Sequence, residues 1–121
     1  MLSEHYSLGF FEQTLSMELA GKKLGVLLSA RPEQPNFTHA IALAEAALKR
    51  GVQVYFYCID EAVAGLDRPS LQKLKAQGAN LFACAYGAQK RNLSLGDLAT
   101  FAGLSTVSDL IASTDRFVSF N

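Results

Sequence analysis

The chain has 121 residues, half of them hydrophobic, which is enough for one domain with a substantial core. Lys and Arg together number 11, as do Asp and Glu, so the formal net charge is zero. Direct binding to nucleic acid is therefore not expected, because proteins that bind the phosphate backbone carry a basic excess.

The cysteine content and the amino terminus indicate a reducing compartment. Two cysteines, Cys58 and Cys84, are too few for the disulfide scaffold of a small secreted domain. No apolar run approaches the length of about 20 residues that crosses a bilayer, and the first residues lack the basic region of a signal peptide. We expect a cytoplasmic protein with no membrane partner.

The first predicted elements are a buried strand and a helix. Residues 24–29 form a continuous apolar run, which is typical of a strand covered on both faces. Two prolines place residues 31–36 in a loop, with Asn36 as the expected helix N-cap. Apolar residues at helical spacing predict a helix over 37–50, and Gly51 is expected to end it.

Two more strands follow. Residues 52–58 are rich in β-branched and aromatic types and predict the second strand, with its aromatic side chains packing on the sheet. A short helical turn is expected over 60–66 and a short helix from Ser70 to Gln77. Residues 80–84 predict the third strand.

The last third of the chain is expected to hold three short helices and a strand. The first helix spans 85–91, with Asn92 in the left-handed conformation that ends it. Ser94 and Ser105 are the expected N-caps of the other two. Residues 116–120 predict the final strand.

Strands that alternate with helices predict an α/β fold, a three-layer α/β/α sandwich with a mainly parallel sheet. This domain covers residues 23–121, and residues 1–22 form an N-terminal extension. Part of the extension has apolar residues on one helical face, so it is a candidate helix that packs on the body or on a neighbour. The residues of this face are Leu8, Phe11, Leu15 and Leu19.

Several chemistries have no support in the sequence. Neither of the two glycine-rich phosphate-binding motifs, GxGxxG and GxxxxGK[ST], is present. The potential zinc ligands His5, His39, Cys58 and Cys84 are scattered rather than closely spaced. We expect neither a cofactor nor a metal, and a solvated or capping role for His39 in the first turn of its helix.

Both cysteines lie where a strand ends, at the edge where ligands gather in an open parallel sheet. Asp60 and Glu61 follow Cys58 and disfavour a thiolate there. Cys84 instead precedes a predicted helix, whose N–H groups favour a negative sulfur. Lys90 and Arg91 lie near the end of that helix and could attract an anionic partner. Cys84 is therefore the preferred reactive thiol.

Other interpretations of the same residues stay open. A single cysteine at a strand end is commonly a small packing residue. Cys58 and Cys84 could form a disulfide if their strands are neighbours. Lys90 and Arg91 could simply be a solvated helix end that complements the helix dipole.

Four segments in register resemble the DsrE/DsrF-like family of small sulfur-relay proteins. They are the strand and helix at 24–29 and 40–48, the strand and acidic turn at 54–63, the stretch 84–92, and the ending at 103–110 and 115–120. Sulfur-carrying members of the family have a cysteine before a helix that ends in Arg-Gly. Cys84 and Arg91 match that spacing, and Asn92 stands in place of the glycine.

The resemblance implies a sulfurtransferase-type carrier that holds sulfur as a persulfide on Cys84. Lys90 and Arg91 would stabilise the anion at long range or dock a partner. The implied partners are sulfur donor and acceptor proteins and further copies of the chain in a trimer or hexamer, working in sulfur oxidation or tRNA thiolation. The alternative is an oligomeric binding or regulatory module of the same fold in which Cys84 only packs.

Overall fold

The computed structural model describes residues 18–93 and 96–121, which form a five-stranded, all-parallel sheet. Strand order across the sheet is β4-β3-β2-β1-β5. The strands are β1 (Lys23–Leu28), β2 (Gln53–Cys58), β3 (Asn80–Cys84), β4 (Thr100–Ala102) and β5 (Arg116–Phe120).

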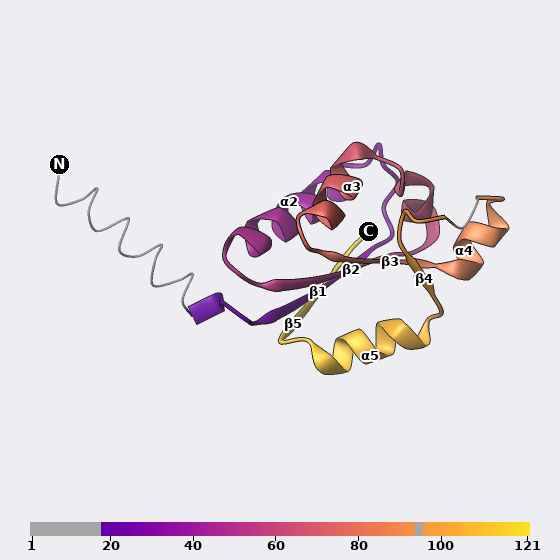
Figure 1. The fold of residues 1–121 in the computed structure, drawn as a ribbon. Coiled ribbons are helices and arrows are strands. Elements are labelled where there is room, and N and C mark those ends of the chain that lie inside the picture. Colours follow the sequence, from indigo (N-terminus) through magenta and orange to yellow (C-terminus); the bar gives the residue numbers. More distant parts are fainter. Residues whose placement is uncertain (1–17, 94–95) are drawn as a thin grey trace.

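Helices cover both faces of the sheet. They are α2 (Pro35–Lys49), the 3-10 helix η1 (Asp60–Gly65), α3 (Pro69–Ala76), α4 (Ala85–Lys90) and α5 (Ser105–Ser113). Figure 1 shows α2 and α3 on one face, α5 on the other and α4 beside the end of β3. The expected α/β/α sandwich is therefore confirmed. None of the helices in the described part of the chain is long and apolar enough to cross a membrane.

The core follows from the alternation of side chains along each strand. Val26, Phe56 and Leu81 occupy matching positions on β1, β2 and β3 and are fully or almost fully buried. Because successive side chains point to opposite faces, the residues between them lie on the α5 face. Tyr57 and Phe82 are paired on that second face.

One predicted helix is absent, and a strand takes its place. Ser94, its expected N-cap, lies outside the described residues, but Thr100–Ala102 pairs in parallel with β3 as the edge strand β4. The prediction of a helix up to Gly103 is therefore wrong. A three-residue strand is too short to show the alternation of side chains that identifies a strand in a sequence. A distant residue also stabilises β4: the Tyr57 hydroxyl donates to Ala102 O at 2.9 Å.

Two helix starts also differ from expectation. The N-cap of α2 is Gln34 rather than Asn36, and Pro35 is the first helical residue, a position that suits its fixed φ and missing N–H. The Asn36 amide instead donates to Asn121 O at 2.9 Å, and its Oδ1 lies 3.2 Å from Nδ1 of the exposed His39. In α5 the N-cap is Leu104, and Ser105 is already helical.

Gly25 provides a test of how β5 packs on β1. A Cβ at Gly25 would lie 2.5 Å from Phe117 Cδ2 and 3.3 Å from Thr114 Cγ2. We expect Gly25→Ala to lower the free energy of unfolding by about 1–3 kcal/mol because the Phe117 ring must move. Urea unfolding measures the change. Gly96→Ala is the matched control, since a Cβ there meets nothing within 4 Å; equal stability of the two variants would contradict the packing described.

Candidate functional site

Cys84 is at once the last residue of β3 and the N-cap of α4. Because the strand passes into the helix without a loop, the first turn of α4 lies directly over the cysteine. The sulfur accepts a hydrogen bond from the Gly87 backbone N–H, with an N to Sγ distance of 3.4 Å. The structure therefore places a backbone donor on the sulfur, as the sequence predicted for a cysteine before a helix.

Tyr57 forms the second side of the site. It is fully buried on the same face as Cys84, and its hydroxyl lies close to Ala102 O (2.9 Å) and Gly103 O (3.3 Å). Burial raises the pKa of Tyr57 to about 12, helped by the charge of Cys84 and by a side-chain hydrogen bond with it. A phenol has one proton to donate, so the sulfur and the two carbonyl groups compete for it.

Arg91 and Glu61 form the third side. One guanidinium nitrogen of Arg91 donates to Gly87 O at 3.3 Å, and the other lies 3.2 Å from Glu61 Oε1. The guanidinium therefore reaches back along α4 to the residue whose N–H meets the sulfur. Lys90, by contrast, is exposed at the end of α4.

The acidic partner of Arg91 was not expected at this place. From the sequence, Glu61 was expected to act on Cys58, whereas its carboxylate pairs with Arg91 and so links η1 to the end of α4. Tyr57, too, was expected only to pack on the sheet. Both contacts join segments about 30 residues apart, so no local pattern could have revealed them.

The two cysteines lie on neighbouring strands but on opposite faces of the sheet. Cys58 pairs with Ala83, so Cys84, one residue further, points to the other side. Both are free thiols, and the disulfide considered from the sequence is not formed. Cys58 is completely buried, and burial raises its pKa to about 12, so it remains a protonated packing residue at neutral pH.

Access to Cys84 is narrow. The residue is 5% exposed, and the space above it is taken by α4, where a Cβ on Gly87 would come within 3.3 Å of Val63 and 3.5 Å of the Cys84 Cβ. Tyr86, in the first turn of α4, is instead 70% exposed. A reagent must therefore approach the sulfur past α4, a helix of only six residues.

These groups can hold and polarise a sulfur atom. The Gly87 N–H donates a hydrogen bond to the sulfur, and the Arg91 guanidinium, bonded to Gly87 O, adds positive charge beside it. Across residues 18–93 and 96–121, no group of three or more His, Cys, Asp or Glu side chains is placed to hold a metal ion.

Comparison with known proteins identifies the fold. The sequence profile of the DsrE/DsrF-like family matches residues 22–120. The crystal structure of the ychN protein from E. coli superposes with a TM-score of 0.70 at 18% identity, covering 83% of this chain and 99% of that chain. No curated protein sequence matches the chain.

The buried groups Cys58 and Tyr57 predict a loss of stability at alkaline pH. Burial raises the pKa of Cys58 from 9.0 to about 12 and that of Tyr57 from 10.0 to about 12. Above pH 9 the unfolded chain therefore loses protons that the folded protein keeps. The free energy of unfolding should fall between pH 9 and 12 by up to about 1.4 kcal/mol per pH unit for each group. Urea unfolding at a series of pH values measures the slope.

Cys58→Ala is the control for this prediction. The variant should show a shallower fall that begins nearer pH 10, because Tyr57 remains. An unchanged pH dependence in Cys58→Ala would show that the Cys58 thiol is not protected by burial.

Proposed function

The chain belongs to the DsrE/DsrF-like family, and we propose that it is a cytoplasmic sulfur carrier that holds persulfide sulfur on Cys84. The observation that carries the proposal is the hydrogen bond from the Gly87 N–H to the Cys84 sulfur at the carboxyl end of β3. The spacing from Cys84 to Arg91, which resembles that of sulfur-carrying relatives, adds to it.

The reaction is a pair of thiol exchanges. The Cys84 thiolate attacks the outer sulfur of a donor persulfide, R–S–SH; the donor S–S bond breaks, R–S⁻ leaves and Cys84–S–SH forms. An acceptor thiolate then attacks the outer sulfur of Cys84–S–SH, takes it as a new persulfide and releases the Cys84 thiolate. Sulfur moves twice with no net oxidation or reduction, so neither step needs a cofactor.

The surrounding groups have separate roles in these steps. The Gly87 N–H stabilises the thiolate that attacks in the first step and leaves in the second. Arg91 adds positive charge from beside Gly87, and the exposed Lys90 is free to contact a partner protein.

Transfer also requires the sulfur to become reachable. Cys84 is almost buried, so donor and acceptor must displace part of α4 or reach the site while it is open. A helix of only six residues at the carboxyl end of β3 is the kind of element that opens locally at low cost. Docking of a partner next to Lys90 and the exposed Tyr86 would promote this opening.

The partners we propose are a sulfur donor protein, a sulfur acceptor protein and further copies of the chain. The resemblance implies a trimer or a hexamer. Two large apolar side chains near the site's face of the sheet, Leu104 just before α5 and Ile111 within it, are more than half exposed, which suits a contact with another copy.

A second candidate function is an oligomeric binding or regulatory module. The burial of Cys84 favours this alternative, since a thiol that never meets solvent is a packing residue. Alkylation separates the two functions. The module account expects Cys84 to stay unlabelled in the folded protein and to react only after denaturation, whereas the carrier account expects labelling in the folded state.

Sulfur loading tests the carrier directly. After incubation with a small-molecule persulfide, the intact protein should gain the mass of one sulfur atom, and peptide mapping should place it on Cys84. Cys58→Ala should load as the wild type does, because Cys58 lies on the other face of the sheet. Absence of sulfur on Cys84, or equal loading of Cys84→Ser, would refute the carrier.

The ion pair between Arg91 and Glu61 should control the reactivity of Cys84. Glu61→Gln frees the guanidinium, so alkylation of Cys84 should speed up roughly two- to five-fold, and Arg91→Gln should slow it by a similar factor. This range corresponds to about 0.4–1 kcal/mol, which lies within the roughly 0.2–1 kcal/mol measured for exposed ion pairs. Glu45→Gln on α2 removes an acid away from the site and should leave the rate unchanged; the same rate in all variants would exclude a role for Arg91.

A further inference from the structure

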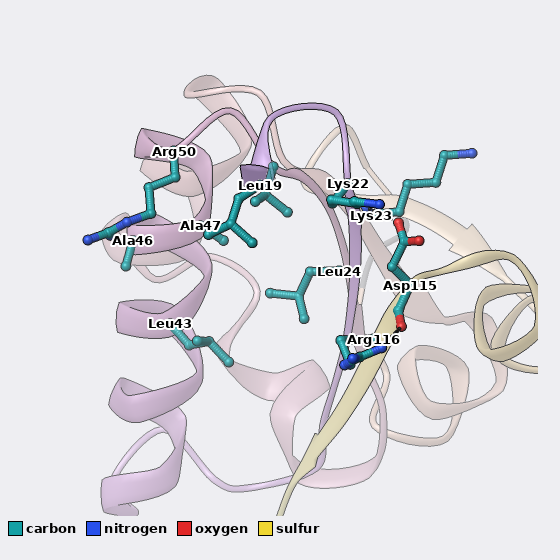
Figure 2. A pocket seen from close by; sticks show the side chains of 11 residues that line it. Leu19, Lys22, Lys23, Leu24, Leu43, Ala46, Ala47, Arg50, Asp115 and Arg116 are labelled. Carbon is teal, nitrogen blue, oxygen red and sulfur yellow. Dashed lines mark hydrogen bonds between the residues drawn. The ribbon is translucent and has the colours of Figure 1, made fainter. Parts of the chain in front are cut away.

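A groove lies at the end of the sheet opposite Cys84, between α2 and the first residues of β1 and β5. It has a volume of about 560 Å³. Its floor is apolar: Figure 2 shows Leu24 and Leu43 pointing into the space between the strand and the helix, with Ala47 and Leu19 beside them. An exposed apolar groove of this size on a small domain is typical of a binding site.

Basic side chains surround this floor. They are Lys22, Lys23, Arg50 and Arg116. Asp115 is the single acidic lining residue, and its carboxylate already accepts a hydrogen bond from the Lys23 backbone N–H at 2.7 Å. In the described part of the chain, the two ion pairs are Arg68–Glu33 and Arg91–Glu61, and neither involves a groove residue. The matching occupant is therefore both apolar and acidic.

We infer that residues 8–17 of the same chain dock in this groove as an amphipathic helix. The point of attachment supports this occupant. Leu19 itself lines the groove, and the chain beside it is fixed by backbone hydrogen bonds from Gly21 N to Gly51 O (3.0 Å) and from Gln53 N to Lys22 O (2.8 Å). A segment tethered at the rim meets the groove at a high effective concentration.

The composition of the segment matches the groove. In the sequence, Leu8, Phe11 and Leu15 stand at helical spacing from Leu19, which lines the groove, so a helix over this segment would place all four on one face. At 3.6 residues per turn, Glu12 and Glu18 fall on either side of that face, toward the basic rim. Residues 1–18 contain three Glu and no Lys or Arg, whereas the groove is basic.

This docking is a property of the chain beyond its proposed sulfur chemistry. The match to the DsrE/DsrF-like family begins at residue 22, so the docked segment adds to the shared fold rather than belonging to it. The groove is at the amino ends of the strands and Cys84 at a carboxyl end, so loss of the docked helix and loss of sulfur loading can be measured independently.

Cross-linking in the full-length chain tests the inference. Cysteines are introduced as Leu15→Cys and Leu43→Cys in a Cys84→Ser background, where the remaining Cys58 is fully buried. A short bismaleimide added to dilute protein should join the two cysteines within one chain, as intact mass shows. The matched control pairs Leu15→Cys with Ser108→Cys, an exposed position on α5 across the sheet.

Two results would overturn the inference. One is a yield no greater than that of the control pair. The other is a link formed only between chains, which would mean that the segment docks on a second copy.

Hydrogen exchange on the unmodified chain provides a measurement that needs no substitution. Amides of residues 11–16 should exchange at least about tenfold more slowly than in the isolated peptide 1–17. Glu12→Lys should reduce this protection, whereas Gln13→Lys, on the outward side of the helix, should leave it unchanged. Exchange at the rate of the free peptide, or equal effects of the two lysines, would overturn the inference.

Discussion

The parallel register between β2 and β3 is the constraint on which the candidate site depends. Cys58 lies opposite Ala83, so Cys84 follows on the other face of the sheet, the face that carries Tyr57. One step of alternation therefore separates the fully buried Cys58 from Cys84, whose sulfur accepts a backbone hydrogen bond. A shift of one residue in this register would exchange the environments of neighbouring side chains and remove the site.

The direct passage from β3 into α4 adds the second requirement. Since no loop separates strand and helix, Cys84 is the N-cap, and the Gly87 N–H is aimed at its sulfur. Position 87 also has little room for a side chain, because a Cβ there would lie 3.3 Å from Val63 Cγ2. The same geometry that polarises the sulfur covers it, so reactivity and access depend on the one short helix α4.

Much of the fold could be predicted from the sequence because its signals are local. The strands β1, β2, β3 and β5 were expected from runs of apolar, β-branched or aromatic residues, and the left-handed Asn92 that follows α4 was expected from its residue type. The edge strand β4 was missed because three residues carry no periodicity and their place is set by pairing with β3. The sequence also selected Cys84 by charge, but the neighbours that shape its site, Tyr57 and Glu61, come from another strand and the turn after it.

A sulfur carrier must release the sulfur that it has accepted on Cys84. The most direct test is a chase: protein loaded with one sulfur on Cys84 is separated from the donor and mixed with an acceptor thiol. For a carrier, the added mass should leave Cys84 and appear as a persulfide on the acceptor, while the protein returns to its original mass. Sulfur that stays on Cys84 in the presence of excess acceptor would contradict the carrier function.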